Sequence, residues 1–286
     1  MTKSLLGQEL PVPAMSAATA ARLQANLTAA EADFAADPTL ENMIWYGRRL
    51  AYIFRYDEAI QVFTDGLERY PDSHELRRHR GHRYISTRQF DNAIADFEAA
   101  AQLAADRPVA IEPDGTPNRL NQPVSNSHFN IWYHLGLSYY LTGQFAKAID
   151  SYHTCMTYSD NDDSITATSD WLYMSLRRLN RPAEAAAVLE PIHSGMTIVE
   201  SPSYLNRLLM YKGERTPESL LQPEEETPES TAIAIATQGY GVGNWYLYNG
   251  DEARAREIFN MVLATPQWSA FGYIAAEVDM VALGAG

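Results

Sequence analysis

The sequence predicts an all-α protein built as an α-α superhelix, because a triplet of one glycine, one alanine and one aromatic residue recurs along it. In each triplet the glycine precedes the alanine by 12 residues, and the aromatic residue follows 4 residues later. The first two triplets lie 34 residues apart at all three positions. The triplets are Gly47, Ala59 and Phe63; Gly81, Ala93 and Phe97; Gly136, Ala148 and Tyr152; and Gly243, Ala255 and Phe259. Glycine and alanine allow two helices to pack closely, so each triplet predicts one helical hairpin.

The period and the residue types resemble the tetratricopeptide repeat (TPR) family, whose repeats have this length. The third repeat carries the fullest match, with Trp132, Leu135, Gly136, Tyr139, Gly143, Phe145, Ala148 and Tyr152. The resemblance implies a TPR-like solenoid in which the first helix of each repeat lines a concave groove. It also implies a scaffold that presents a surface rather than a reaction centre.

The N-terminal part of the chain divides into a lead-in and two repeats. Residues 1–38 are expected to form an irregular segment and a first amphipathic helix over Thr19–Ala36, which ends before an Asp-Pro pair. Residues 39–104 hold the first two repeats. Pro71 follows the second helix of the first repeat, where the family pattern places a proline.

An insertion separates the second repeat from the third, since Gly81 and Gly136 lie 55 residues apart. The surplus is the proline-rich stretch 105–127, and a loop of this length inside a compact array is usually either functional or disordered. Residues 128–190 hold the third and fourth repeats. In the fourth, Tyr173 stands where the glycine is expected, so that hairpin must pack differently.

The period weakens after the fourth repeat. Residues 191–235 are expected to form a degenerate helical repeat, with one helix over Ser203–Tyr211 and a second, shorter one after it, followed by an acidic connector with three consecutive glutamates. Residues 236–286 hold the last repeat and a helix over Trp268–Leu283 that can cap the array.

Composition agrees with a soluble helical protein. The chain has 286 residues, of which 46% are hydrophobic. Its formal net charge of −14 disfavours binding to nucleic acid, because the negative surface would repel phosphates. Only Lys3, Lys147 and Lys212 among the 22 basic residues are lysines. Nearly every cation is therefore an arginine, whose planar guanidinium can bind a carboxylate through two hydrogen bonds.

Targeting signals and reactive cysteines are also sparse. No apolar run is long enough to span a bilayer, and the N-terminus lacks a basic segment followed by an apolar one, so we expect a cytoplasmic protein. Cys155 is the only cysteine, which excludes an intrachain disulfide, and its helix-packing position predicts a buried, unreactive thiol.

In the family, certain positions of each first helix face the groove, and the residues of this chain at those positions are candidate binding residues. Most of them are arginine, histidine, amide or aromatic side chains. These are Arg48, Tyr52, Arg78, His79, His82, Asn130, Tyr133, His134, Asp170 and Arg177. Such groups can hold an extended peptide, because guanidinium groups bind carboxylates and amides bind the backbone. We expect no metal and no cofactor, since the histidines lie beside arginines and no phosphate-binding or dinucleotide-binding motif is present.

The segment from Arg77 to Arg83 is the densest basic stretch, and nine of the 19 arginines lie between Arg48 and Arg88. One interpretation is an anion-binding groove with a locally positive potential. The other is internal ion pairing with Glu112 and Asp114 of the insertion or with acidic residues of the same repeats, namely Glu41, Asp57, Glu58, Asp65, Glu68, Asp72 and Glu75. Residues on one helix cover all its faces, so only some of these arginines can face the groove.

The main functional hypothesis is a non-catalytic scaffold that binds an extended peptide or protein segment, with an anionic anchor held by arginine and histidine. The chain lacks the lysine and asparagine pattern of the TPR modules that bind carboxylates. An alternative is a protein or enzyme in which the 105–127 loop encloses a small anionic ligand and His82 and His134 act as acid-base groups. A third hypothesis is that the groove is filled by the chain's own loop or by a second copy.

Overall fold

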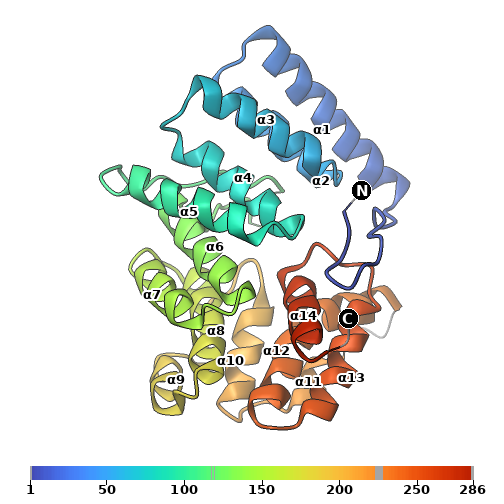
Figure 1. Cartoon of the computed structure of the whole chain (residues 1–286), viewed down its shortest axis with the longest axis vertical. Coiled ribbons are helices and arrows are strands. Elements are labelled where there is room, and N and C mark those ends of the chain that lie inside the picture. The colour runs from blue at the N-terminus through green and yellow to red at the C-terminus, as the bar shows by residue number, and fades with distance from the viewer. Residues whose placement is uncertain (1, 117, 119, 223–227, 285–286) are drawn as a thin grey trace. The chain divides into compact units, whose positions relative to one another are not determined.

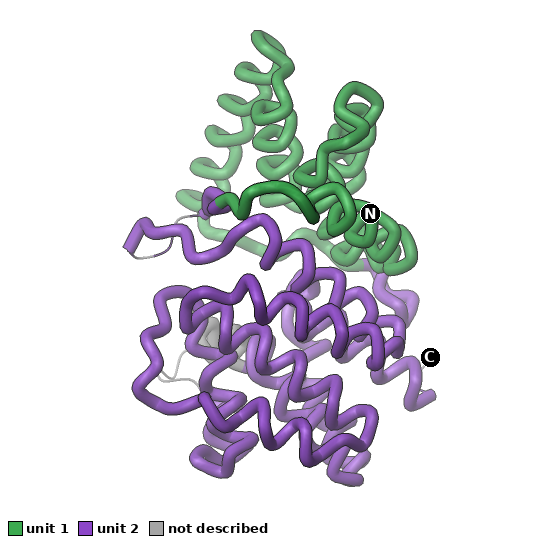
Figure 2. Tube along the Cα trace, turned by 90° about the vertical axis from the view of Figure 1, so that its left-hand side faces the viewer, with its two compact units in different colours: residues 1–2, 10–110 green, residues 3–9, 111–286 purple. Residues whose placement is uncertain are grey.

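The computed structural model describes residues 2–116, 118, 120–222 and 228–284, with side chains described from residue 235 onward in the last range. Within these residues the chain forms fourteen α-helices and two isolated β-bridges, which agrees with the all-α prediction. The chain divides into two compact units (Figure 2). Unit 1 comprises residues 1–2 and 10–110, and unit 2 comprises residues 3–9 and 111–286.

Unit 1 is a stack of antiparallel helices (Figure 1). Its helices are α1 (Ala17–Ala36), α2 (Leu40–Tyr52), α3 (Tyr56–Arg69), α4 (His74–Ser86) and α5 (Phe90–Ala104). The side chains of Ser16, Thr39 and Ser73 accept backbone N–H groups at the starts of α1, α2 and α4. The first helix therefore begins two residues before the predicted Thr19, since Ser16 caps it.

Unit 2 contains the remaining helices. They are α6 (Ser127–Leu141), α7 (Phe145–Met156), α8 (Asp162–Arg178), α9 (Pro182–Val188), α10 (Pro202–Tyr211), α11 (Pro217–Leu220), α12 (Pro228–Tyr248), α13 (Glu252–Leu263) and α14 (Phe271–Ala282). The boundary expected at residue 236 falls inside α12, and the expected C-terminal helix begins at Phe271 instead of Trp268. The run of glutamates at 224–226 lies outside the described residues.

The repeated triplet is a packing device. In each hairpin the aromatic ring of the second helix lies against the glycine of the first. A methyl group added at Gly81, Gly136 or Gly243 would come within 2.9, 2.7 or 2.6 Å of that ring. The four triplet alanines are completely buried. Glycine is therefore required because the ring occupies the space of a side chain.

The last helix joins elements that are distant in the sequence. Helix α14 packs against α12 and α13, as expected of a capping helix, and it also contacts α6. Helix α8 packs against α10 and α12. The side chains of α6 and α8 are consequently almost all buried. In unit 2 the chain's own helices thus cover the face that the family pattern assigns to ligand.

The insertion has an ordered base. Ile111 pairs with Asn126 in an isolated bridge, and the amide of Glu112 donates to the carbonyl of Ser125 at 3.0 Å. The side chain of Asn161, at the start of α8, donates to the carbonyl of Val124 at 2.7 Å. The described part of the insertion is therefore fastened to α6 and α8. None of the described helices has the length and apolar composition needed to cross a bilayer.

The glycine–aromatic contact predicts that a glycine-to-alanine substitution lowers stability, which is the opposite of its usual effect inside a helix. Replacing a glycine inside a helix by alanine normally stabilises by about 1 kcal/mol. We expect Gly136→Ala to destabilise unit 2 by about 1–3 kcal/mol, because the new methyl group overlaps the Tyr152 ring. Urea unfolding followed by circular dichroism measures the difference. Ala146→Val, on the exposed side of α7, is the control and should change stability by about 0.5 kcal/mol or less. Stabilisation by Gly136→Ala would contradict the packing argument.

Candidate binding sites

Two predicted site residues of unit 2, Tyr133 and Asp170, contact helix α10, which the groove pattern did not include. Asp170 is completely buried and forms a bidentate ion pair with Arg207 of α10, at 2.8 Å between Nη2 and Oδ2 and 3.1 Å from Nε. Burial lowers the pKa of the Arg207 guanidinium, but the Asp170 carboxylate outweighs burial and raises that pKa above its usual value. Asp170 thus holds α10 against α8.

Arg207 has further partners on α12. Its Nη1 donates to the carbonyl of Thr237 at 2.5 Å. Within α10, its guanidinium lies 4.9 Å from the ring centre of Tyr204. A methyl group at Gly241 would overlap the Arg207 side chain, so this glycine makes room for it. Arg207 therefore joins α8, α10 and α12 through buried polar contacts.

Three other predicted residues have internal roles in unit 2. The hydroxyls of Tyr133 and Tyr204 lie 2.8 Å apart, which adds a contact between α6 and α10. His134 is buried, with its Nδ1 2.5 Å from the carbonyl of Asn130 and its ring against Phe271. The Asn130 amide donates to the Glu112 carboxylate at 3.0 Å, which helps to hold the insertion.

Arg177 lies at the end of α8, apart from that group. Its guanidinium is 4.3 Å from the ring centre of Tyr248, and it donates to Tyr173 and to Asn249 at 3.1 and 2.8 Å. Tyr173, which replaces the expected glycine of the fourth repeat, stacks on Tyr211 with ring centres 4.3 Å apart. Arg177 therefore covers an aromatic cluster that joins α8, α10 and α12.

A second buried polar network joins the C-terminal helix α14 to the rest of unit 2. Arg178 forms a bidentate ion pair with Asp279 of α14, at 2.9 Å for each oxygen. The Asp279 carboxylate also accepts from the Tyr240 hydroxyl at 3.0 Å, and the Tyr140 hydroxyl is 2.7 Å from that of Tyr240. These contacts explain why α14 lies against the repeats. Sequence spacing could not reveal them, since the partners are far apart in the chain.

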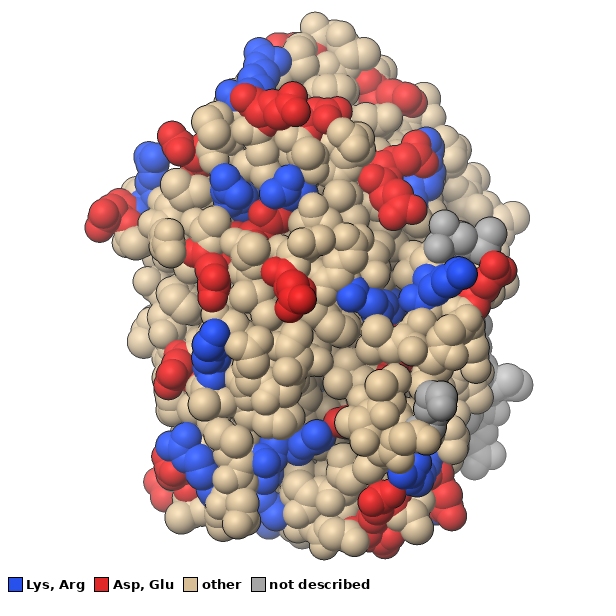
Figure 3. Space-filling view, viewed as in Figure 1, with Lys and Arg blue, Asp and Glu red and all other residues tan. Residues whose placement is uncertain are grey.

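In unit 1 the arginines divide into two groups. Arg80 pairs with Asp96 of α5 through two hydrogen bonds of 2.7 and 2.8 Å, and Arg77 lies 3.7 Å from the same carboxylate. These two arginines are thus paired internally, but with Asp96, which was not among the expected partners; Arg55 pairs with Glu58, which was. Basic and acidic side chains are also interspersed over the face shown in Figure 3.

The second group gathers Arg48 of α2 with Arg78 and Arg83 of α4, and we call these three residues the arginine face. Burial lowers the pKa of the Arg83 guanidinium, and the positive charges of Arg78 and Arg48 lower it further. All three residues are partly exposed. Arg83 belongs to the basic segment but was not among the groove candidates. Like charges are concentrated here, which is what an anion-binding surface requires.

Aromatic and histidine side chains support the arginine face. The Arg48 guanidinium lies 4.3 Å from the Trp45 ring centre and donates to the Tyr52 hydroxyl at 3.4 Å. Arg78 lies 2.9 Å from Nδ1 of His79, whose ring stacks on Phe63. His82 is partly exposed one helical turn after Arg78. Among the described residues, no group of three histidine, cysteine or acidic side chains could hold a metal ion.

The fold and these sites define the class of the protein, an α-solenoid of helical repeats. A sequence model of the tetratricopeptide repeat matches residues 129–162, which include α6 and α7. The chain therefore contains a tetratricopeptide repeat over residues 129–162, as the triplet of the third repeat predicts. No curated protein matches its sequence.

Several solved structures share the fold. A tetratricopeptide repeat protein from Parabacteroides merdae is 11% identical, and the match covers 92% of this chain and 94% of that one with a TM-score of 0.52. YrrB, described as a TPR protein with an unusual peptide-binding site, is 15% identical over 88% of this chain and 97% of its own, with a TM-score of 0.45. MamA is 16% identical over 70% and 89%, with a TM-score of 0.46.

The ion pair between α8 and α10 can be tested by removing its negative member. We expect Asp170→Asn to destabilise unit 2 by about 3–5 kcal/mol, because Arg207 would be left charged and buried without its partner. Urea unfolding at neutral pH measures the change. Glu257→Gln, which breaks the exposed pair with Arg254, should leave stability unchanged.

A double variant separates the loss of a pair from the loss of packing. Asp170→Leu combined with Arg207→Met should recover most of the stability, since no buried charge remains. A double variant as unstable as Asp170→Asn would contradict this account of the pair.

The thiol of Cys155 provides a test of the core of the third repeat. The side chain is completely buried, and burial raises the pKa of the thiol to about 12. At pH 8 the folded protein should therefore not react with a thiol reagent on the time scale on which the guanidinium-unfolded protein reacts completely. Absorbance with a chromogenic disulfide measures both rates. Rapid reaction in the folded state would show that α7 does not pack as described.

Proposed function

We propose that this protein is a non-catalytic interaction scaffold that binds an extended, anionic protein segment on the arginine face of unit 1. The concentration of like charge at Arg48, Arg78 and Arg83 carries the proposal. Each guanidinium group can donate charge-assisted hydrogen bonds to a carboxylate, and the three groups place several such donors on one surface of unit 1.

The flanking groups favour a peptide over a bare ion. Trp45 and Tyr52 hold the Arg48 guanidinium in place, which lowers the entropy lost when it binds a carboxylate. Tyr52 and His82 add partly exposed groups that can contact peptide amides and side chains. The TPR fold supports the same class of ligand, because its repeats build an extended surface.

In unit 2 the corresponding face has a different role. Tyr133, His134 and Asp170 are buried and bonded within the unit. The proposal therefore places peptide binding on α2 and α4 and assigns the groove-facing residues of unit 2 to stability.

The arginine face can be tested with a fluorescent peptide rich in glutamate and an otherwise identical peptide with glutamine. We expect the glutamate peptide to bind, with an affinity that falls as salt is added, and the glutamine peptide to bind more weakly. Arg48→Gln combined with Arg78→Gln should weaken binding by at least about tenfold, since each charge-assisted hydrogen bond contributes about 1.5–3 kcal/mol. Fluorescence anisotropy measures the dissociation constants.

A matched variant controls for net charge. Arg55→Gln combined with Arg69→Gln removes the same charge from exposed positions of the same unit and should change the affinity little. Equal losses in the two double variants, or no loss in the first, would contradict the proposal.

A further inference from the structure

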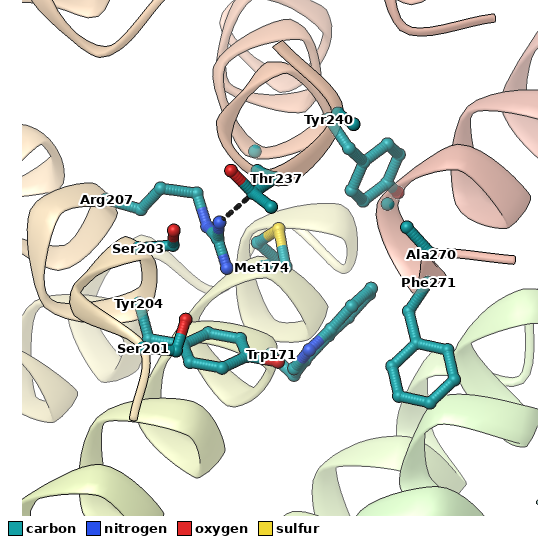
Figure 4. Close-up of a pocket in the computed structure, with 13 residues that line it drawn as sticks. Trp171, Met174, Ser201, Ser203, Tyr204, Arg207, Thr237, Tyr240, Ala270 and Phe271 are labelled. Carbon is teal, nitrogen blue, oxygen red and sulfur yellow. Dashed lines mark hydrogen bonds between the residues drawn. The ribbon is translucent and has the colours of Figure 1, made fainter. Parts of the chain in front are cut away.

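Unit 2 contains a pocket that the proposed peptide site does not use. It has a volume of about 130 Å³ and lies between α8, α10, α12 and the start of α14 (Figure 4). Residues that line it include Trp171, Ser201, Ser203, Arg207, Tyr240 and Phe271. A cavity of about 150 Å³ in another protein holds one benzene molecule, so the size fits a single six-membered ring.

The two sides of the pocket differ in chemistry. Tyr240 and Phe271 form one side, Trp171 lies between the sides, and Arg207 and Ser203 stand on the other (Figure 4). Trp171 and Tyr240 are buried and stacked, with ring centres 5.9 Å apart. The apolar side therefore offers flat surfaces suited to an aromatic ring.

Hydrogen-bonding groups gather on the side of α10. The hydroxyls of Ser201 and Ser203 lie there. Ser201 is the N-cap residue of α10, but its side chain makes no capping hydrogen bond. A ligand group that both donates and accepts would satisfy these hydroxyls.

The charge of the pocket selects a neutral ligand. Among the residues that line the pocket, Arg207 is the positively charged one. It is already paired with Asp170 and donates to the Thr237 carbonyl. A ligand carboxylate would have to compete with Asp170 for the guanidinium, and a ligand cation would lie beside that guanidinium. The favourable substituent is thus an uncharged hydroxyl.

The pocket is preformed at its rim. The Asp163 carboxylate accepts backbone N–H groups of Val199, Glu200 and Ser201 at 2.8, 2.9 and 3.3 Å, which sets the approach to α10. At the opposite edge, a methyl group on Gly272 would lie 3.1 Å from the carbonyl of Ala236. Close contact between α12 and α14 therefore fixes the other wall.

We propose that this pocket binds one neutral phenol ring, with the ring against Trp171, Tyr240 and Phe271 and the hydroxyl toward Ser201 and Ser203. The ligand is a free monocyclic phenol or the side chain of a tyrosine in a partner. The inference depends on unit 2 alone, so its test does not depend on whether the arginine face binds a peptide.

The direct test titrates the whole protein with p-cresol, toluene and benzoate, using calorimetry and nuclear magnetic resonance shifts. We expect saturable binding of p-cresol, binding of toluene weaker by about 3–10-fold because one hydrogen bond is lost, and no saturable binding of benzoate. A second arm uses N-acetyl-tyrosinamide. Saturation by both phenols indicates a tyrosine side chain as the source, and saturation by p-cresol alone indicates a small molecule.

Variants assign the binding to the pocket. Ala270→Leu places a larger side chain in the partly exposed mouth and should weaken p-cresol binding at least tenfold, whereas Ala264→Leu, at an exposed position after α13, should not. Ser203→Ala should reduce the preference for p-cresol over toluene while leaving toluene binding unchanged. No saturation by p-cresol, equal binding of toluene, or unaltered p-cresol binding by Ala270→Leu would each overturn the proposal.

Discussion

The contact between an aromatic ring and the bare backbone of a glycine determines how each regular hairpin of this protein packs. The ring of Tyr152 covers Gly136 so closely that any side chain there would overlap it. Ala148, one turn before that ring, is completely buried and lets the helices approach. Because the same contact recurs in the other triplets, successive hairpins have the same internal geometry, and repeats of this kind can stack in register.

The fourth repeat shows what happens where that contact is missing. Tyr173 takes the place of the glycine, and its ring turns to stack on Tyr211 of α10. The second helix of the pair, α9, is only seven residues long. Helix α8 therefore gains partners from later in the chain, and the ion pair between Asp170 and Arg207 fixes α10 against it. A break in the repeat pattern thus allows unit 2 to cover its own inner face.

The arginines illustrate how one segment can serve two purposes. Arg77 and Arg80 pair with Asp96 of the neighbouring helix and stabilise the second repeat. Arg78 and Arg83 lie on other faces of the same helix, where Arg48 brings further positive charge. The helical period separates the two groups. Internal ion pairing therefore describes Arg77 and Arg80, and anion binding stays a proposal for Arg78 and Arg83.

The sequence by itself determined the all-α class, the hairpins of the regular repeats, the position of the insertion and the buried state of Cys155, because these follow from local spacing and from which residues fit between two helices. Only the tertiary structure decided that Arg207 pairs with Asp170, that α14 returns to α6, and that a pocket remains beside Trp171. These features join residues far apart in the chain through single contacts, and no period along the sequence records which distant side chains will meet.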